Sequence, residues 1–417
     1  MKKLKNLAIN LGLTVSTLIF SIAVGEIGLR IAKIETPPPP REDSNKELLY
    51  TTKDPYRGWA GNPNGKSFWT GEGIPSEIKM NSGGFRDYER SKSKPENGLR
   101  IALLGDSFTE AIHVKLEDTY GAIIEQKLQQ CPVLKDRKVE VMNFGVQGYG
   151  TAQELMTLRH HVWDYSPDLV MLVFYSGNDL RNNSRTLEHD HLRPYFIYQD
   201  GQLVADMSFR DLKFWQRDRY NFSLVDSLPF WLVQNSRILQ LIRKVDINTK
   251  RRQFEKDYSE INLAFYKEPK PNSDWEETWE LTEDLIKLMR DEVDEKGAEF
   301  MLITASDAYQ VLPDTQKRDG FRKSLNVPNL FYPDIRLKNF GKEENIPVYN
   351  LAGPIWDKAK KTGKCLHGFD NAVPCGGHWN IEGHKLVGEI MANYLCDRYT
   401  NQLSKEGEKE KRSRIKN

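Results

Sequence analysis

The chain has 417 residues, and its 60 Lys and Arg residues nearly balance 59 Asp and Glu residues, which leaves a formal net charge of +1. At about 150 residues per domain, this length predicts two or three domains, or one large domain with insertions. The balanced charge argues against a protein that mainly binds nucleic acid. The mean hydropathy of −0.63 excludes a multi-pass membrane protein, and 4 cysteines are too few for a disulfide scaffold.

The N-terminus has the pattern of a membrane-targeting segment. Lysines within residues 1–5 precede an apolar run over residues 7–24 that only neutral polar residues interrupt. A run of about 18 residues just spans a bilayer core of roughly 30 Å, and flanking lysines favour the cytoplasmic side. We therefore expect residues 1–34 to anchor the chain, with the rest outside the cytoplasm. A cleaved signal peptide, which would leave the protein secreted, and a helix of the soluble core are the alternatives.

Two segments of unusual composition flank the remaining chain. Four consecutive prolines at 37–40 predict a stiff polyproline linker over residues 35–49. At the other end, residues 401–417 are almost entirely charged or polar, so we expect a solvated, disordered tail. Residues 50–400 therefore form the predicted globular body.

Within that body, short apolar runs alternate with helical patterns. Strands are predicted at residues 100–105, 139–146, 169–175, 300–304 and 346–350, and helices at 107–128 (with an internal loop), 151–165, 275–295 and 381–399. Strands that alternate with helices pair in parallel through right-handed crossovers. The predicted fold class is therefore α/β, with a parallel sheet inside a three-layer α/β/α sandwich.

A long segment over residues 182–272 interrupts this alternation. It is rich in aromatic residues and contains a predicted helix over residues 228–245. Because it leaves from a strand end where chemistry gathers in such sheets, it is a candidate lid or substrate wall. The alternative is a structural subdomain that packs on the edge of the sheet.

Polar motifs follow three of the predicted strands. Gly105-Asp106-Ser107 ends the first strand, residues 143–150 follow the second, and residues 176–179 follow the third. The carboxyl ends of parallel strands meet at one edge of the sheet. We therefore expect these motifs to form one site.

The motifs resemble the conserved blocks of the SGNH, or GDSL-type, esterase and lipase family. The matching blocks are Gly105-Asp106-Ser107-Phe108, Gly148 within Asn143-Phe144-Gly145-Val146-Gln147-Gly148, Gly177-Asn178-Asp179, and His378 within His378-Trp379-Asn380-Ile381-Glu382-Gly383-His384. The resemblance covers about residues 80–400. It implies a flavodoxin-like sheet and a serine ester hydrolase that needs no cofactor.

Acyl transfer needs a nucleophile, a base and donors for the developing oxyanion. Ser107, between a strand and a helix N-terminus, is the candidate nucleophile, and His378 is the candidate base. The resemblance implies that the N–H groups of Ser107 and Gly148 and the side-chain amide of Asn178 form the oxyanion hole. The structural alternatives are an N-cap serine, a loop glycine and a turn asparagine. His384, inside the last predicted helix, is expected to have a structural role.

One residue of the family pattern is missing. The family places an aspartate two or three residues before the histidine, where this chain has Cys375 and Gly376. A Ser107–His378 dyad with a backbone carbonyl orienting the ring is the preferred interpretation. A carboxylate from elsewhere, with Asp370 the nearest upstream candidate, and weakened catalysis are the alternatives. Loss of the orienting carboxylate in a related triad costs about 10⁴-fold in rate.

The cysteines near His378 allow two interpretations besides free thiols. Outside the cytoplasm, Cys365 and Cys375 are expected to form a disulfide that fixes the histidine loop. The alternative is a zinc site formed by Cys365, His367, Cys375 and His378. The spacing does not fit a standard zinc finger, and we expect no metal.

Together these features predict a membrane-anchored, extracytoplasmic ester hydrolase that removes an acyl or acetyl group from a small molecule, lipid or glycan. Two alternatives remain open: an O-acetyltransferase that acts on cell-surface polysaccharide, and a non-catalytic polysaccharide-binding protein on a hydrolase fold. No nucleic acid partner is expected. The sequence does not indicate an oligomeric state.

Overall fold

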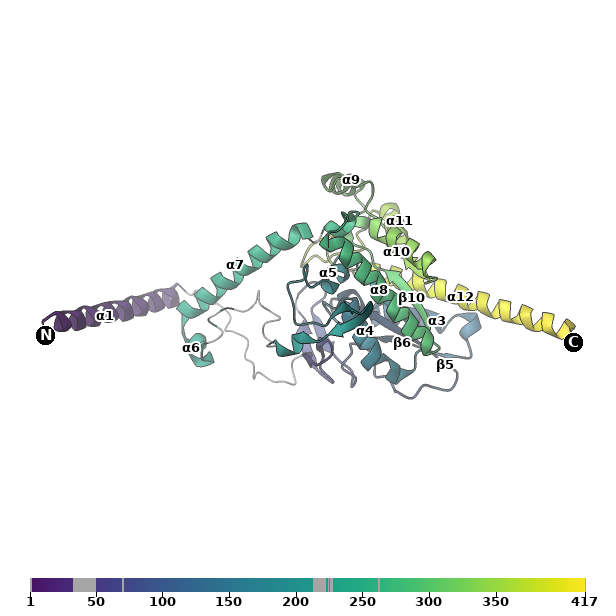
Figure 1. Cartoon of the computed structure of the whole chain (residues 1–417), viewed down its shortest axis with the longest axis horizontal. Helices are drawn as coiled ribbons and strands as arrows, with labels where there is room; N and C mark the ends of the chain where they lie inside the picture. Colours follow the sequence, from purple (N-terminus) through teal and green to yellow (C-terminus); the bar gives the residue numbers. More distant parts are fainter. Residues whose placement is uncertain are drawn as a thin grey trace. The chain divides into compact units, whose positions relative to one another are not determined.

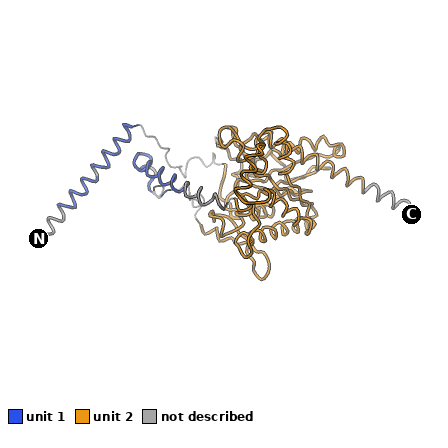
Figure 2. Tube along the Cα trace, turned by 90° about the horizontal axis from the view of Figure 1, so that it is seen from above, with its two compact units in different colours: residues 1–46, 213–260 blue, residues 47–212, 261–417 orange. Residues whose placement is uncertain are grey.

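A computed structural model of the chain describes residues 2–32, 50–69, 71–212, 223, 225, 228–261 and 263–416. The chain forms two compact units, which Figure 2 distinguishes by colour. The smaller unit comprises residues 1–46 and 213–260, and the larger one comprises residues 47–212 and 261–417. The predicted proline-rich linker over residues 35–49 lies outside the described residues.

The larger unit is built around a parallel sheet of five strands (Figure 1). The strands are β5 (Gly98–Gly105), β6 (Lys138–Asn143), β7 (Leu169–Phe174), β10 (Glu299–Thr304) and β11 (Val348–Asn350). They lie in the order β11-β10-β7-β5-β6, and each neighbouring pair is parallel. When the five strands are numbered by their order in the chain and read from the β6 edge, their order is 2-1-3-4-5. This is the flavodoxin-like order. The predicted fold class is confirmed.

Helices cover both faces of this sheet. Helices α4 (Thr151–His160), α8 (Asp274–Glu295) and α10 (Tyr332–Glu343) contribute to one hydrophobic cluster, and α3 (Tyr120–Leu128), α11 (Ala352–Thr362) and α12 (Ile381–Lys416) contribute to another. Successive residues of β5 alternate between the clusters, with Leu104 in the first and Leu103 in the second. A strand buried on both faces reads as a continuous apolar run, which explains why the sheet is visible in the sequence.

Several short elements were not predicted from the sequence. They include three antiparallel hairpins, β1 (Thr51–Asp54) with β2 (Gly58–Gly61), β3 (Lys66–Trp69) with β4 (Ser76–Lys79), and β8 (Tyr195–Gln199) with β9 (Gln202–Asp206), and also helix α9 (Thr315–Ser324). Strands of four or five residues carry too little hydrophobic periodicity to be recognised. The loop between β3 and β4 is nevertheless part of the site described below.

The segment over residues 182–272 is divided between the two units. Its first part, to residue 212, belongs to the larger unit and contains β8 and β9. Helices α6 (Phe230–Asn235) and α7 (Arg237–Ile261) belong to the smaller unit, together with α1 (Lys2–Ile31). The predicted helix over residues 228–245 is interrupted at Ser236. The role of this segment as a lid stays a prediction.

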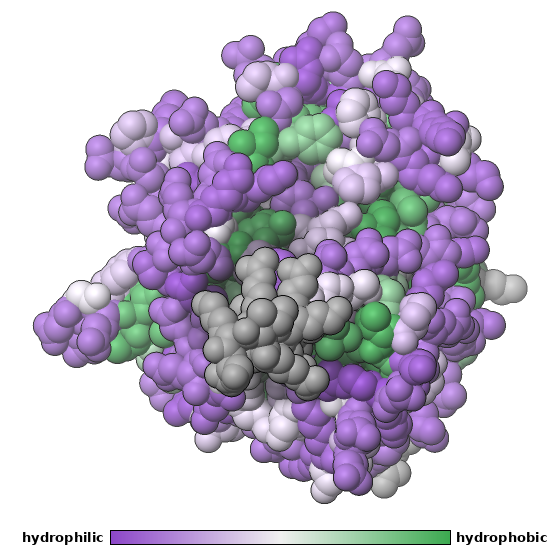
Figure 3. Space-filling view, turned by 90° about the vertical axis from the view of Figure 1, so that its right-hand side faces the viewer, coloured by the Kyte–Doolittle hydropathy of each residue, from purple (hydrophilic) through white to green (hydrophobic). Residues whose placement is uncertain are grey.

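The predicted disordered tail is wrong for most of its length. Helix α12 does not end near residue 399 but continues to Lys416. Residues 405–411 consist mainly of Glu and Lys, which have high intrinsic helix propensity. The face of the molecule in Figure 3 is mostly hydrophilic, and its hydrophobic residues form small separate patches.

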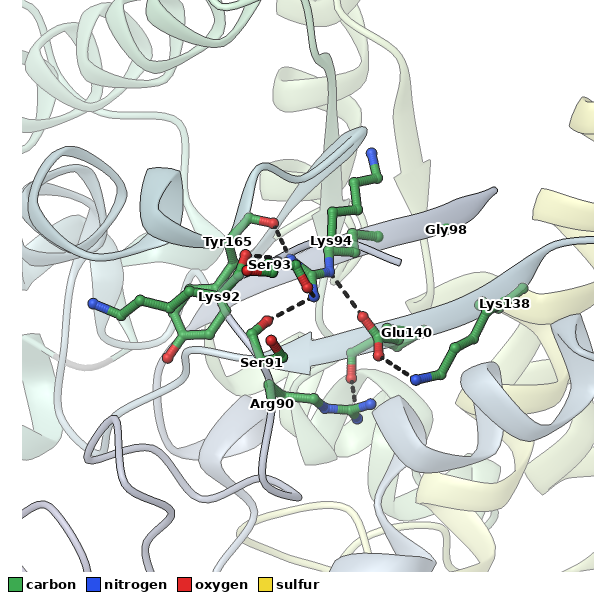
Figure 4. Close-up of polar contacts among 12 residues, drawn as sticks. Arg90, Ser91, Lys92, Ser93, Lys94, Gly98, Lys138, Glu140 and Tyr165 are labelled. Carbon is green, nitrogen blue, oxygen red and sulfur yellow. Dashed lines mark hydrogen bonds and ion pairs between the residues drawn. The ribbon is translucent and has the colours of Figure 1, made fainter. Parts of the chain in front are cut away.

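A buried arginine fastens the amino end of β5, and its partners in residues 91–93, Glu140 and Tyr165 are labelled in Figure 4. Arg100 is fully buried, and its Nε donates a hydrogen bond of 2.8 Å to Glu140 on β6. Its two terminal nitrogens donate to backbone carbonyls of residues 91–93 and Tyr165. A buried charge is tolerated when it is paired and hydrogen-bonded. Arg100 therefore ties the segment that leads into β5 to the sheet.

A disulfide also crosses the larger unit. It joins Cys131, which follows α3, to Cys396 in α12, across a separation of 265 residues. A second disulfide joins Cys365 to Cys375 across 10 residues. In the chain-entropy description, a crosslink that closes a longer loop restricts the unfolded chain more strongly.

We expect replacement of both Cys131 and Cys396 by alanine to lower the free energy of unfolding by about 2–5 kcal/mol. The measurement is chemical unfolding of the oxidised protein. The matched control replaces Cys365 and Cys375 by alanine, and its loss should be smaller because the loop is shorter. Equal losses for the two pairs would contradict this explanation.

Candidate active site

The strand-end motifs meet at the carboxyl edge of the sheet. Strand β5 ends at Gly105, and the short helix α2 (Ser107–Glu110) begins at Ser107. The Asp106 carboxylate caps this helix by accepting the Phe108 N–H at 2.9 Å. Ser107 is half-buried, and its Oγ lies 2.8 Å from Nε2 of His378, on the loop before α12. The structure thus brings together the predicted nucleophile and the predicted base.

The second ring nitrogen of His378 faces a carboxylate. Oε2 of Glu72 lies 2.7 Å from Nδ1, and Oε1 accepts the backbone N–H of His378 at 3.0 Å. Glu72 lies in the loop between β3 and β4, 306 positions before His378 in the sequence. A serine, a histidine and a carboxylate therefore form one hydrogen-bonded chain.

This arrangement corrects two predictions. The preferred partner of the ring, a backbone carbonyl, is wrong because Nδ1 faces the Glu72 carboxylate. Asp370 is also wrong: its side chain is exposed, and it makes no hydrogen bond to His378 in the described part of the chain. The family pattern predicts an acid two or three residues before the histidine, whereas Glu72 lies 306 positions before it. The only local signal for Glu72 is an acidic residue between Gly71 and Gly73.

The carboxylate fixes the protonation of the ring. Because Nδ1 donates to Glu72, the neutral imidazole leaves Nε2 free to accept the proton of the Ser107 hydroxyl. Burial raises the pKa of the Glu72 carboxyl, but the hydrogen bonds from His378 and the electrostatic attraction to that residue outweigh burial and lower this pKa below 4.5. Glu72 is therefore ionised at neutral pH.

Asn371 holds the Glu72 loop against the histidine loop. Its Nδ2 donates to the Gly71 carbonyl at 2.8 Å, and its Oδ1 accepts the Gly73 N–H at 3.1 Å. The indole of Trp69 donates to the carbonyl of Glu72 itself at 2.6 Å. The backbone is thus fixed on both sides of Glu72, which limits the movement of its carboxylate.

Two glycines permit the close approach of these loops. Gly377 has a φ of +67°, and a Cβ there would lie 2.2 Å from Oε1 of Glu72. Gly73 has a φ of +105°, and a Cβ there would lie 2.1 Å from the carbonyl oxygen of His113. A side chain at either position would push the Glu72 carboxylate away from His378.

The alternative of a zinc site at these cysteines and histidines is excluded, and the expected disulfide is present. A disulfide joins Cys365 and Cys375, so these sulfurs cannot act as thiolate ligands. His367 is buried, with Nε2 2.9 Å from the Ser306 hydroxyl and Nδ1 2.7 Å from the Gly377 carbonyl oxygen. Within the described ranges, no group of His, Cys, Asp and Glu residues could hold a metal ion. The disulfide and His367 instead hold the loop that carries His378.

A neutral histidine pair packs beside the candidate base. The ring of His113 stacks on His378, with centroids 4.6 Å apart, and its Nε2 lies 3.1 Å from Nε2 of His384. Nδ1 of His384 accepts the N–H of Tyr120, so Nε2 of His384 donates to His113. Burial lowers the pKa of His384 to about 3 and that of His113 well below its ordinary value. His384 thus has a structural role inside α12.

The predicted oxyanion donors lie at the same edge. The Asn178 side chain lies against the Asp106 carboxyl, and its Nδ2 donates to the carbonyl of Tyr149 at 3.4 Å. Gly148, the preceding residue, has a φ of +77°, which favours glycine. Among the described residues, the N–H groups of Ser107 and Gly148 have no hydrogen-bond acceptor. They are therefore available to a substrate.

Three buried acids lie beneath these donors. Burial raises the pKa of Asp106 to about 6. Burial and the neighbouring acids raise the pKa values of Glu154, on α4, and Asp179 well above their ordinary values. Neither carboxyl oxygen of Glu154 has a hydrogen-bond partner among the described residues. These acids therefore hold protons under conditions where exposed carboxyl groups are ionised.

No protein-family model matches the chain, and no curated protein matches it. Solved structures with similarity include a lipolytic protein of the G-D-S-L family from Desulfitobacterium hafniense, 14% identical, covering 70% of this chain and 98% of that chain, with a TM-score of 0.31. A lipase/acylhydrolase from Enterococcus faecalis is 15% identical, with coverages of 72% and 96% and a TM-score of 0.35. An acetyl xylan esterase is 12% identical, with coverages of 71% and 100% and a TM-score of 0.36. Because these values are low, the function proposed below rests on the site geometry.

The buried acid Glu154 gives a prediction about stability and pH. The unfolded chain releases this proton near pH 4.5, whereas the folded chain keeps it to higher pH. The folded state therefore binds more protons, and its stability decreases as the pH rises above about 4.5. We expect Glu154→Gln, which cannot ionise, to raise the Tm at about pH 8 by about 2–4 °C. The same variant should have little effect at about pH 4.

The measurement is thermal unfolding of wild type and variant over this pH range. Glu295→Gln serves as a control because Glu295 is exposed at the end of α8. A Glu154→Gln variant whose Tm follows the wild-type pH profile throughout would show that Glu154 is not the group responsible.

Proposed function

We propose that this protein is a serine ester hydrolase of the SGNH, or GDSL, type. The observation that carries the proposal is the hydrogen-bonded chain from the Ser107 hydroxyl through His378 to the Glu72 carboxylate. It supplies a nucleophile, a base and an orienting carboxylate in the geometry that acyl transfer requires. Its completeness favours a catalyst over a non-catalytic binding protein.

In the first half of the reaction, the Ser107 oxygen attacks the acyl carbonyl while Nε2 of His378 takes the hydroxyl proton. Glu72 stabilises the imidazolium that forms, because its charge lies 2.7 Å from Nδ1. The carbonyl oxygen gains negative charge. The N–H groups of Ser107 and Gly148 and the Asn178 amide donate to it, and losing one such donor typically costs about 10²–10³-fold in rate.

The remaining steps release the alcohol and then the acid, and they return the enzyme to its starting state. His378 gives its proton to the leaving alcohol as the bond from carbonyl carbon to alcohol oxygen breaks, which leaves an acyl group on Ser107. Water then attacks this acyl-enzyme with His378 again as base, and release of the carboxylic acid restores the serine hydroxyl. The chain's own residues supply every proton transfer, and the proposal requires no cofactor.

We also propose that the enzyme is anchored in a membrane with its catalytic unit outside the cytoplasm. Within the described residues, one helical stretch, Ile9–Ile31, is long and apolar enough to cross a bilayer, with a hydropathy of 1.7. Both disulfides support an oxidising compartment. A cleaved N-terminal segment is the alternative, and it would give a secreted enzyme.

The acyl acceptor distinguishes two forms of this proposal. Hydrolysis uses water, whereas an O-acetyltransferase would pass the acyl group from Ser107 to a hydroxyl of a cell-surface polysaccharide. The substrate in either case is an acylated small molecule, lipid or glycan. Assays with short-chain esters, long-chain esters and acetylated glycans, with and without an oligosaccharide acceptor, separate the two by the product formed.

We expect a fluorophosphonate probe to label the wild-type protein and not Ser107→Ala, because the probe reacts only with an activated serine. Ser324→Ala is the control, since Ser324 is an exposed serine on α9. Labelling is read after electrophoresis. An unlabelled wild-type protein, or equal labelling of Ser107→Ala, would refute the assignment of Ser107.

We expect Glu72→Gln to lower kcat for ester hydrolysis by up to about 10⁴-fold, because the amide removes the charge that stabilises the imidazolium. Glu77→Gln makes the same change at an exposed site on β4 of the same hairpin and should leave kcat within about twofold. Initial rates with a chromogenic short-chain ester measure both. If Glu72→Gln kept wild-type kcat, the His378–Glu72 contact would have no catalytic role.

A further inference from the structure

In the smaller unit, the apolar helix α1 is joined to the start of α7. Oε1 of Glu26, on α1, accepts the N–H of Arg237 at 2.9 Å, and Oε2 accepts the N–H of Ile238 at 3.2 Å and the hydroxyl of Ser236 at 3.2 Å. The first N–H groups of a helix have no partners within the helix and attract negative charge. Glu26 therefore acts as the N-terminal cap of a helix more than two hundred residues away, because the separation to Arg237 is 211.

Further contacts lie on the same side of α1. Arg30 donates to the carbonyl of Asn235 at 2.6 Å and pairs with Glu26 at 2.8 Å. A Cβ on Gly25 would lie 3.4 Å from the side chain of Ile238. Gly25, Glu26 and Leu29 are half-buried, whereas the described apolar side chains earlier in α1 are exposed. The docking is therefore confined to the last turns of α1.

The position of this contact along α1 sets its depth in a membrane. A bilayer core of roughly 30 Å takes about 20 helical residues, which, counted from Ile9, end near residue 28. Glu26 and Arg30 then lie at the outer boundary of the bilayer, where charged side chains reach water and headgroups. Residues 235–238, which they bind, must lie at the same depth.

The residues on either side of this contact have the composition of a protein segment that binds to a membrane surface. Apolar side chains are exposed on α6 and α7 and just before them: Leu228, Trp231, Leu232, Ile242 and Val245. Trp231 is 66% exposed, and tryptophan is favoured at bilayer boundaries. On α7, Ile238, Ile242 and Val245 have the spacing of one helix face. The same turns carry Arg237, Arg243 and Lys244 against the single acid Asp246.

We propose that residues 228–247 form a membrane-surface element that lies in the outer boundary of an anionic bilayer, docked on α1 through Glu26 and Arg30. Its apolar side chains enter the boundary between headgroups and acyl chains, and its basic side chains contact lipid phosphates. The inference rests on the proposed membrane anchoring and not on the proposed catalysis. The inference places residues 228–247, which are part of the segment over residues 182–272, at the membrane surface.

The consequence concerns how the catalytic unit is tethered. The chain passes between the two units after residues 46, 212 and 260. A surface element at residues 228–247 would therefore attach the larger unit to the membrane through the connections near residues 212 and 260 as well as through the proline-rich segment. Such attachment restricts the enzyme to substrates close to the bilayer more strongly than a single linker would.

The test uses the full chain in vesicles that contain an anionic phospholipid. The described cysteines are all in disulfides, so one added cysteine can carry a spin label. Ile242→Cys and Ile335→Cys form a matched pair, because both isoleucines are 49% exposed and Ile335 lies on α10 of the catalytic unit. Collisions with oxygen, which is enriched in lipid, and with a water-soluble nickel complex are measured by paramagnetic resonance.

We expect the label at position 242 to collide several-fold more with oxygen than with the nickel complex, relative to the label at 335. A label at 242 that behaves like the label at 335 would overturn the proposal. Protection of position 242 from both reagents would also overturn it, because a protein surface, either a partner or a second copy, would then cover α7. Glu26→Ala should increase the mobility of the label at 242, and unchanged mobility would contradict docking through Glu26.

Two further measurements distinguish this proposal from the proposed membrane anchoring, on which it rests, and from the proposed catalysis. Release of the chain by alkaline carbonate would refute the membrane anchor itself. Retention of the chain with a water-exposed label at 242 would refute only the surface element. Hydrolysis of a soluble ester by the Ile242→Cys protein reports on the catalytic unit and shows that the labelled chain is folded.

Discussion

The hydrogen bonds between Glu72 and His378 join a loop near the start of the larger unit to a loop near its end. They fix the position of the His378 ring and the ring nitrogen that carries its proton. The glycines and Asn371 around Glu72 have a common effect, which is to bring a carboxylate within 2.7 Å of the ring and hold it there. This one contact therefore explains the conformations of the two loops that carry Glu72 and His378.

The charge distribution around the site follows from burial. Burial raises the pKa values of Glu154 and Asp179 well above their ordinary values, so these acids keep their protons, and burial also keeps the histidines behind His378 neutral. Glu72 is different because a hydrogen-bonded imidazole offsets the cost of its burial. The ionised Glu72 carboxylate is thus the group that would stabilise the imidazolium in the proposed reaction.

The division of the chain into two units separates two physical tasks. The larger unit buries a continuous core on both faces of its sheet and positions the site at the carboxyl edge. The smaller unit leaves much of its apolar surface exposed, which is unfavourable in water and favourable against lipid. The segment over residues 182–272 contributes to both units, since β8 and β9 belong to the larger unit and α7 belongs to the smaller one.

The fold class, the sheet and the pairing of Ser107 with His378 can be predicted from the order of the amino acids alone, because buried parallel strands read as apolar runs and their carboxyl ends carry the polar motifs. The sequence did not reveal Glu72, the division of the insertion or the helical tail. A single acidic residue in a short loop carries no periodicity, and its partner lies 306 positions away. Only the folded chain decides which distant loops meet, because packing and close approach at glycines such as Gly377 set that geometry.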